Sequence, residues 1–552
     1  MRRLVVGGTF CLLVCIGLGV AFWQWWRWNQ KPIPAVRLAA GNAIVYMEVR
    51  DVGSAYKRWR ATSLAGILAE PSVQRFLTHP AGKVFHDYKA ARETVARLRP
   101  SSFFFFRTDY NRQNWVAGIR CSSDLSRWRD EVQELLQNCC GYRLLELPVQ
   151  AAGEKRETVV SDRPGHRTVF GLRLANWLLL GQNPEMLRAC AERGRKARAG
   201  LEESALFQKC LSQVPSMSDF LTYFKGSVLS QPGLPWKAPA EVANVEAIVA
   251  ATSFDGPRIR DTVFTCEKVP GKPGSLERRS IGLAGPNPLF YGAFRLNLLK
   301  LRAVAHTLAS KWSIAETLQT YLDEATSSGF NLEEVSQLLE SVELILNRDP
   351  ASDNLSFVLT ATTRDPIRFR VFADRLMEAK FSGQWTRTEI EGVKAYVLRA
   401  NDAVSLVIGV YGRQLYVATS GSAFAEALRR ARAQDRPLER NEQYRNTVAL
   451  VAPPTEAFAY LDTKGVFERV YPMARPMIVF GSAFIPTLAE YVDPATFPET
   501  DEIARHLSPI VCSRRRIEYG VLDESVGPVT GYQASIVTLG VCGALGLFQE
   551  GE

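Results

Sequence analysis

The chain has 552 residues, of which 46% are hydrophobic and 22% charged, with 67 Lys and Arg against 57 Asp and Glu. These proportions are ordinary for a globular protein and exclude a wholly disordered chain, a collagen-like chain and a small disulfide-rich scaffold. A mean hydropathy of -0.08 excludes a bundle of several membrane spans. At about 150 residues per domain, the length predicts three or four domains.

Residues 4–23 form an uncharged apolar stretch between Arg2-Arg3 and a cluster of Trp residues at 23, 25, 26 and 28. Twenty helical residues at about 1.5 Å each span a bilayer core of about 30 Å, and Trp favours its interface. A cleavable signal peptide is the alternative, but small residues do not follow the apolar stretch. We expect a single-pass signal anchor in a bacterial inner membrane, with residues 1–3 as a cytoplasmic stub and the bulk of the chain extracytoplasmic. The opposite orientation would leave the chain cytoplasmic and tethered.

Two parts of the chain match one another in an ordered series. The matched segments are 42–49 with 288–294 (offset 245), 115–119 with 357–361 (242), 124–136 with 365–377 (241), 169–180 with 407–418 (238), 205–207 with 442–444 and Tyr223 with Tyr460 (237), and 254–257 with 525–528 (271). A slowly drifting offset is typical of tandem duplication. The jump from 237 to 271 predicts an insertion of about 34 residues in the second copy, near 471–509.

The matched segments alternate short strands with amphipathic helices. Asp124 and Asp365 suit the N-caps of two helices, and further helices are predicted over 184–192 and 422–432. Ser102–Phe106 predicts a buried strand rather than an exposed binding patch. Hairpin-like strand pairs outnumber strand–helix–strand crossovers, so we expect an α+β fold.

The expected architecture is an N-terminal transmembrane helix followed by two tandem, duplicated domains with mainly antiparallel sheets and amphipathic helices. In chain order we expect a juxtamembrane linker at 24–40, copy 1 at 41–268, a linker at 269–287, copy 2 at 288–534 with its insertion, and an apolar C-terminal segment and tail at 535–552.

The sequence contains no recognisable catalytic, cofactor or metal motif. The five His residues lack the spacing of a helical zinc site, and the glycine-rich phosphate loops and the Gly-x-Ser-x-Gly elbow are missing. Ser54–Lys57 and Ser352–Asn354 match two of three motifs of the serine acyl-transferases that use a lysine base, but the third, Lys-Thr-Gly, is missing. We therefore expect no enzyme activity, no catalytic residue, no cofactor and no metal.

Eight of the 10 Cys residues lie outside the apolar N-terminal stretch. Cys121, Cys190, Cys210 and Cys266 correspond to residues other than Cys in the second copy, which favours small buried hydrophobes over disulfides required by the fold. In an oxidising compartment, Cys139-Cys140 remain candidates for a bridge specific to the first copy.

Basic residues follow two matched helices. The candidate anionic-surface contacts are Arg193, Arg195, Arg198, Arg429, Arg430 and Arg432. Solvated helix ends are the simpler interpretation, because cations are favourable beside the carbonyl groups at a helix C-terminus. Anionic lipid headgroups or acidic envelope polymers are the candidate partners, and nucleic acid is not expected outside the cytoplasm.

Four segments carry a resemblance to a known family: Asn42–Val49, Leu178–Leu187, Ser204–Phe207 and Thr500–Pro509. The chain resembles, over most of residues 41–530, a bacterial family of unknown function, the domain-of-unknown-function 3352 type. The resemblance implies a membrane-anchored envelope protein and supplies no catalytic residue. We expect a non-enzymatic, membrane-anchored binding or scaffold protein of the cell envelope. The alternative is a lipid-handling carrier or a hydrolase with a site between the two copies.

Overall fold

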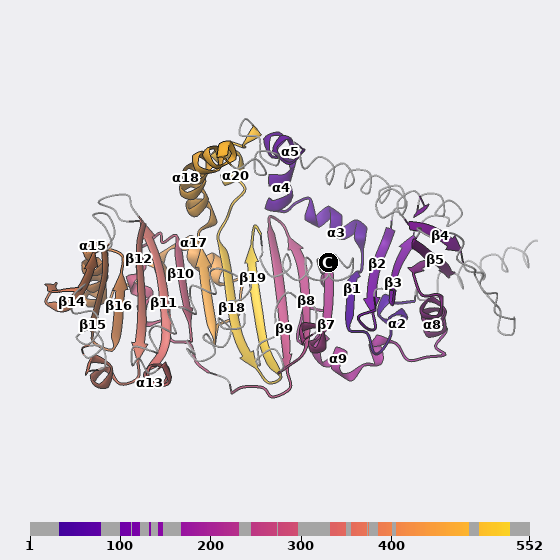
Figure 1. Ribbon diagram of the computed structural model, residues 1–552, viewed down its shortest axis with the longest axis horizontal. Helices are drawn as coiled ribbons and strands as arrows, with labels where there is room; N and C mark the ends of the chain where they lie inside the picture. Colours follow the sequence, from indigo (N-terminus) through magenta and orange to yellow (C-terminus); the bar gives the residue numbers. More distant parts are fainter. Residues whose placement is uncertain are drawn as a thin grey trace, which may run out of the picture.

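The strands of the protein form one long sheet. The computed structural model describes residues 33–78, 100–111, 113–121, 132–133, 142–146, 167–230, 244–272, 274–295, 332–348, 355–371, 374, 385–399, 405–484 and 496–529. Within these residues, 19 strands belong to a single sheet that extends along the longest axis of the molecule (Figure 1).

The first half of the sheet contains nine strands. From the outer edge inward they are β4 (Tyr142–Glu146), β5 (Arg167–Leu174), β6 (Trp177–Gly181), β3 (Trp115–Cys121), β2 (Pro100–Arg107), β1 (Val45–Val49), β7 (Phe220–Lys225), β8 (Val245–Asp255) and β9 (Arg258–Glu267). Ser102–Phe106 lies in β2 with Phe104 and Phe106 fully buried, so the prediction of a buried strand is confirmed.

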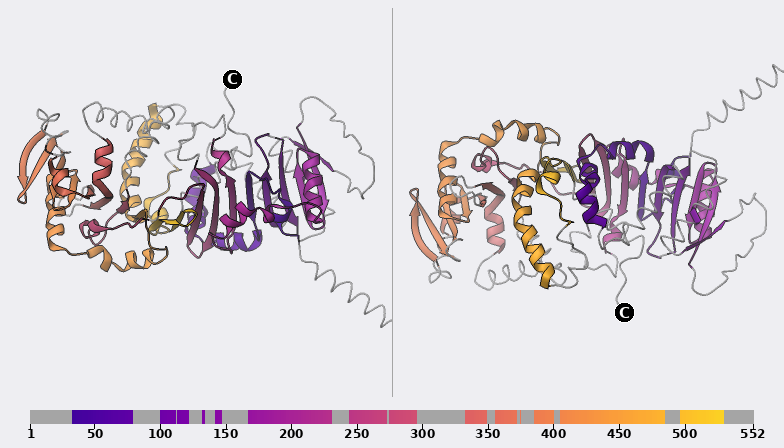
Figure 2. Two further views of the ribbon diagram at one scale, coloured as in Figure 1. Left: turned by 90° about the horizontal axis from the view of Figure 1, so that it is seen from below. Right: turned by 90° about the horizontal axis from the view of Figure 1, so that it is seen from above.

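The second half repeats this order from the opposite edge, with one additional strand at that edge. Its strands, again from the edge inward, are β13 (Trp385–Ile390), β14 (Val393–Arg399), β15 (Ser405–Tyr411), β16 (Gln414–Ala418), β12 (Leu355–Thr363), β11 (Leu339–Arg348), β10 (Phe290–Phe294), β17 (Ala457–Leu461), β18 (Ile510–Ile517) and β19 (Gly520–Gly527). Figure 2 shows the two halves side by side along the long axis, the first in indigo to magenta and the second mainly in orange to yellow.

The halves meet where β9 pairs with β19, from Ile259 opposite Gly527 to Cys266 opposite Gly520. Thr262 stands opposite Glu524 in this ladder. The strand pairs that lead from β1 to β9 in the first half match those that lead from β10 to β19 in the second half. By this register, Thr262 and Glu524 are equivalent residues. Equivalent residues that face each other define an isologous two-fold contact, which here lies within one chain.

The expected fold class, an N-terminal transmembrane helix followed by two domains with sheets of their own, is wrong. The last strand of each half would be an edge with unpaired backbone groups, and pairing β9 with β19 satisfies them in one continuous sheet. The sheet is mixed, because β4 runs parallel to β5 while the other pairs are antiparallel. No helix in the described part of the chain is long and apolar enough to cross a membrane. Residues 4–23 lie outside the described residues.

One matched segment is misaligned. Gly256 lies in the turn between β8 and β9 with a φ of 55°, whereas Gly527 is the last residue of β19. Strand pairing equates Thr262 with Glu524, an offset of 262 rather than 271. From the offset of 237 at Tyr223, the second half therefore gains 25 residues between β17 and β18, not 34.

Helices pack on one face of each half. They are α2 (Ala35–Leu38), α8 (Pro184–Gly194) and α9 (Ala205–Leu211) in the first half, and η3 (Arg279–Leu283), α15 (Gly421–Ala433), α16 (Pro437–Arg440) and α17 (Glu442–Val448) in the second. The side chains of Asn183, Ser204, Ser420 and Asn441 cap four of them by accepting a backbone hydrogen bond in the first turn. The helices predicted over 184–192 and 422–432 are confirmed as α8 and α15.

Two segments that the sequence places in linkers belong to the cores. Leu38 of α2 and Leu283 of η3 are buried and stand 245 residues apart, the offset of the strands that follow them. Each segment lies across its half of the sheet and contributes to the main hydrophobic cluster there. This placement matters for the site, because α2 forms one of its walls.

A second group of helices stands beyond the strand ends (Figure 1). It contains α3 (Val52–Trp59), α4 (Ser63–Ala69) and α5 (Pro71–Thr78) from the first half, and α18 (Thr463–Phe484) and α20 (Thr500–Ala504) from the insertion; α13 (Leu332–Leu338) precedes β11. Phe76 stacks near Phe497 with ring centroids 5.1 Å apart, and Glu70 pairs with His506 at 2.6 Å and Arg505 at 2.5 Å. These contacts join the halves a second time.

Candidate functional site

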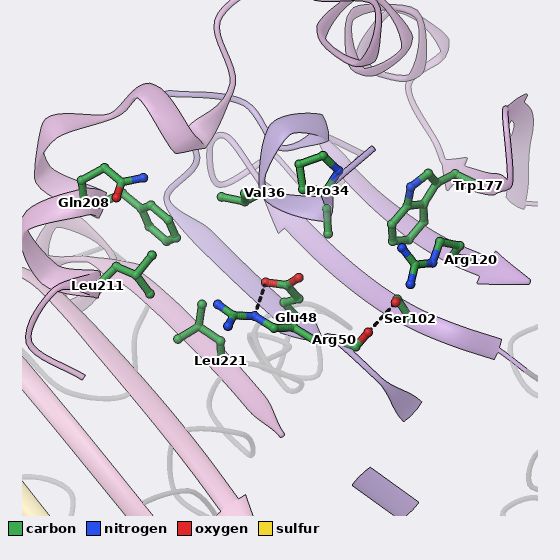
Figure 3. A pocket seen from close by; sticks show the side chains of 12 residues that line it. Pro34, Val36, Glu48, Arg50, Ser102, Arg120, Trp177, Gln208, Leu211 and Leu221 are labelled. Carbon is green, nitrogen blue, oxygen red and sulfur yellow. Dashed lines mark hydrogen bonds and ion pairs between the residues drawn. The ribbon is translucent and has the colours of Figure 1, made fainter. Parts of the chain in front are cut away.

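A pocket of about 380 Å³ opens in the first half between the sheet, α2 and α9 (Figure 3). The sheet contributes its polar groups: Glu48 and Arg50 from the end of β1, Ser102 from β2 and Arg120 from β3. The helices contribute mainly apolar side chains, including those of Val36, Phe207 and Leu211. The volume lies at the lower end of the range of small-molecule sites.

Alternation along β1 places the acidic group inside. Successive side chains of a strand point to opposite faces, so Tyr46, Glu48 and Arg50 share the face that α2 and α9 cover. Glu48 lies opposite Phe104 of β2, whose ring extends over Gly118 of β3. A Cβ at Gly118 would lie 2.0 Å from a carbon of that ring, so the glycine is required by this close approach.

The carboxyl of Glu48 is the central charged group. Its side chain is 12% exposed, and burial raises its pKa while the nearby guanidinium of Arg50 opposes the rise. Arg50 Nε lies 3.5 Å from Glu48 Oε2, and the Ser102 hydroxyl donates to the Arg50 carbonyl at 2.5 Å. Burial, followed by the charge of Glu48, raises the pKa of Tyr46 well above its usual value. The Tyr46 hydroxyl is buried and approaches the Glu48 carboxyl without forming a hydrogen bond of standard geometry.

Arg120 is held against an aromatic platform. Its guanidinium carbon lies 5.7 Å from the ring centroid of Trp177, within the range of cation–π contacts. Trp177 is fixed in turn, because its Nε1 donates to the Ile33 carbonyl at 3.0 Å. Arg120 Nε donates to the Ser101 hydroxyl at 3.1 Å, and no carboxylate in the described part of the chain forms an ion pair with this guanidinium.

The same place in the second half is filled by hydrogen-bonded side chains. Glu343 is buried there and accepts from the Tyr291 hydroxyl at 2.7 Å and the Ser280 backbone N–H at 2.8 Å. The Ser280 hydroxyl lies 2.6 Å from that of Thr360 and accepts from Gln414 Nε2 at 2.7 Å. Tyr291 corresponds to Tyr46, so equivalent tyrosines have a well-formed hydrogen bond to a carboxyl in one half and only a weaker contact with one in the other.

The acidic residue has changed strands between the halves. In the first half Glu48 on β1 faces Phe104 on β2; in the second, Ala293 on β10 faces Glu343 on β11. Both halves therefore keep one carboxyl in the same cross-strand pair. The phenylalanine is lost in the second half, and polar groups around Glu343 fill the space.

The three basic residues predicted on α8 are divided between core and surface. Arg193 is buried and donates through Nε to the Leu38 carbonyl at 2.7 Å, and burial lowers its pKa. Arg198 pairs with Glu192 at 2.7 Å, and Arg195 is exposed at the C-cap. Arg193 is thus a structural residue that holds α2, and the other two remain at the surface.

The three on α15 pair with carboxylates of the chain itself. Arg429 lies 2.9 Å from Glu426 and 3.2 Å from Glu391, Arg430 lies 2.8 Å from Glu426, and Arg432 lies 3.5 Å from Glu391. Figure 1 shows α15 and α8 at opposite ends of the molecule, so the structure does not bring the two groups together. Contact with an anionic surface stays a prediction for each group separately.

Other candidate groups have structural partners. Cys190, Cys210 and Cys266 are free and buried in the first core. Ser54 donates its hydroxyl to Asp51, the N-cap of α3, at 2.8 Å, whereas Ser352–Asn354 lies outside the described residues. Among the residues that the structure describes, no three His, Cys, Asp or Glu side chains gather as metal ligands.

Sequence reasoning missed Glu48, Arg50, Arg120 and Trp177. One signal was present: a charged residue at 48 shares the inward face of a predicted strand with Tyr46. A buried acidic position in an otherwise apolar strand is a better pointer to a site than the exposed arginines after a helix.

The comparisons with known proteins give no family. No family model and no curated protein matches the chain. Among solved structures, crystal form III of TP0453 is 12% identical with a TM-score of 0.25, covering 49% of this chain and 86% of that one. Crystal form IV of TP0453 is 10% identical with a TM-score of 0.24, covering 47% of this chain and 84% of that one. These TM-scores are too low to indicate a shared fold.

Proposed function

We propose that the protein is a non-enzymatic binding protein of the bacterial cell envelope, whose first half binds a small molecule in the pocket beside Glu48. The observation that carries the proposal is the difference between equivalent places. In the second half, hydrogen bonds around Glu343 close the space, whereas in the first half a cavity stands open beside Glu48 and the buried Tyr46.

The lining of the pocket favours binding of a small ligand over lipid transport. A carrier needs a deep apolar cavity, whereas here four polar side chains of the sheet face the space. A few polar groups in an apolar pocket orient a ligand by hydrogen bonds and charge. The pocket also lies within one half, not between the halves where the alternative hydrolase site was expected.

The envelope location is supported by the sequence of the first 28 residues, an uncharged apolar stretch between arginines and tryptophans. Protease added to spheroplasts should degrade the described part of the chain. Full protection of that part, with degradation after lysis, would contradict an extracytoplasmic location.

The pocket is tested by what the purified protein carries. Full-length protein is isolated under native conditions, and bound small molecules are extracted and identified by mass spectrometry. Gln208 lies on α9, is exposed and lines the pocket, so Gln208→Trp should place a large ring over the opening and remove the bound molecule. Arg445 is the equivalent exposed position of α17, and Arg445→Trp is the matched control that should retain it. The same molecules in all three proteins would refute the proposal.

A further inference from the structure

We infer that the pocket takes a small organic anion, whose acidic group pairs with Arg120 and whose apolar part lies against Phe207 and Leu211. The inference rests on the proposed function and adds the chemical class of the ligand. It is carried by the charges that converge on the cavity and by their arrangement relative to its apolar wall.

The charge balance of the pocket is positive. Arg50 and Arg120 bring two guanidiniums, and Glu48 is the acidic side chain among the residues that line the space. Arg50 is already engaged, since it lies 3.5 Å from Glu48 and donates to the Ser216 carbonyl. Arg120 therefore offers the cation that a ligand can reach without breaking an ion pair seen in the described residues.

The position of Arg120 suits recognition of an acidic group with two or more oxygens. Contact with Trp177 at 5.7 Å and the bond from Nε to Ser101 hold the guanidinium in place. Its terminal nitrogens form no hydrogen bond with the described residues, and a guanidinium can offer two parallel N–H donors to a carboxylate, phosphate or sulfonate. A donor fixed before binding loses little conformational entropy when the ligand arrives.

The opposite wall suits an aromatic or aliphatic group. Phe207 and Leu211 lie one turn apart on α9 and line the cavity. Figure 3 shows Leu211, Leu221 and Val36 around the same end of the cavity. Each buried methylene of a ligand contributes about 0.8 kcal/mol by leaving water. Figure 3 places this wall across Glu48 from Arg120, so a molecule with an acidic end and an apolar end spans the pocket.

Glu48 couples the binding of an anion to the uptake of a proton. The groups that face it are Tyr46 and Arg50 on its own strand and Arg120 on β3, while β2, β7, α2 and α9 bring uncharged side chains to the pocket. A second negative charge beside this half-enclosed carboxyl disfavours its ionised form. The protein should therefore take up a proton on binding, and the affinity for an anion should rise as the pH falls.

Three probes that share one ring system test the class. Naphthalene-2-sulfonate is an anion at every pH used, naphthalene-2-sulfonamide is its neutral counterpart, and 2-naphthylmethylamine is the cation. Isothermal titration of the full-length protein should show the sulfonate binding about tenfold tighter than the sulfonamide, a difference of about 1.4 kcal/mol. Arg120→Met should remove this preference, and Arg445→Met, which removes a charge from the second half, should not.

A separate variant tests whether anion binding is coupled to protonation of Glu48. The affinity of the natural protein for the sulfonate should increase as the pH is lowered toward the pKa of Glu48, which burial raises above the usual value for a glutamate. Glu48→Gln should bind the sulfonate more tightly at a pH above that pKa and lose the pH dependence. Circular dichroism of each variant shows whether the fold is retained.

The outcomes separate the two proposals. Equal binding of sulfonate and sulfonamide, or tighter binding of the amine, would overturn the anionic class while a loss of binding in Gln208→Trp still supports the pocket. Binding of all three probes that Gln208→Trp leaves unchanged, or no binding of any probe, would overturn the proposed function itself.

Discussion

The two equivalent tyrosines allow a comparison of the same substitution in both halves, in which effects common to the two variants cancel. Tyr46 and Tyr291 are both fully buried on the first strand of their halves, and both stand near a buried glutamate. The Tyr291 hydroxyl donates to Glu343 at 2.7 Å, whereas the Tyr46 hydroxyl approaches Glu48 without forming a hydrogen bond of standard geometry. Replacing either residue with Phe removes one hydroxyl and keeps the ring.

The two substitutions are expected to change the free energy of unfolding by different amounts. Tyr291→Phe should lower the free energy of unfolding by about 1.5–3 kcal/mol, the range for a hydrogen bond to a charged group. Tyr46→Phe should change it by less than about 1 kcal/mol, because the hydroxyl that is removed makes only a weak contact with Glu48. Both values come from urea unfolding of the full-length protein followed by circular dichroism. Equal losses in the two variants would refute the assignment of partners.

Three further perturbations follow from the same structure. Gly118→Val should destabilise the first half by about 1–3 kcal/mol in urea unfolding, because its Cβ would meet the Phe104 ring; an unchanged midpoint would contradict this packing. Hydrogen bonds from Arg505 and His506 lower the pKa of Glu70, so its contribution to stability is present above its unfolded pKa of about 4.3 and is lost as pH falls through the lower folded value. Glu70→Gln should flatten the acid side of the unfolding midpoint, and a steeper slope would count against it. Burial raises the pKa of Cys190 to about 12, so mass spectrometry should find this thiol unalkylated by iodoacetamide in native protein and alkylated in denatured protein.

Local patterns predicted the local elements well. The N-cap at Asp365 is present, since its carboxylate accepts the backbone N–H groups of Ile367 and Arg368. The buried strand at Ser102–Phe106 and helices α8 and α15 are also as expected. These features depend on residues within one or two turns of each other, which is the range over which capping and periodicity act.

Long-range pairing could not be predicted in the same way. The union of β9 with β19 joins residues more than 250 positions apart, and nothing in either strand specifies its partner. The misaligned Gly256 shows a related failure, because a Gly-Pro pair reports a local turn or strand end and not its place in the sheet. The ion pairs of Arg429 and Arg432 with Glu391 are also long-range, because Glu391 lies in the turn between β13 and β14. The pairs with Glu426, in contrast, lie within α15.

The candidate site was missed because its groups come from separate strands. Glu48, Ser102 and Arg120 lie on three neighbouring strands and have no common motif in the sequence. Their meaning emerges from comparison with the second half, where the acid group of the same cross-strand pair is on the other strand. The carboxyl belongs to the same cross-strand pair in both halves but comes from a different strand in each. A search for identical residues at matching positions of the two halves cannot find it.

The different strand position of the carboxyl in the two halves leads to a last prediction. It concerns a variant in which the first half is given the side-chain arrangement of the second. The variant combines Glu48→Ala with Phe104→Glu, so that the carboxyl moves to β2, and adds Ala35→Ser to reproduce Ser280 of the second half. The Tyr46 hydroxyl should then gain a carboxylate partner, as Tyr291 has, and the pocket should close. Binding of naphthalene-2-sulfonate should be lost while the fold is retained.

The decisive readout is the cost of removing the Tyr46 hydroxyl. In the natural chain Tyr46→Phe should leave the free energy of unfolding almost unchanged. In the exchanged background the same substitution should lower it by about 1.5–3 kcal/mol. The comparison is a double-mutant cycle, so changes common to both backgrounds cancel. If Tyr46→Phe stays neutral after the exchange, the carboxyl has not taken the place that Glu343 occupies, and strand position alone does not explain why one half is open and the other closed.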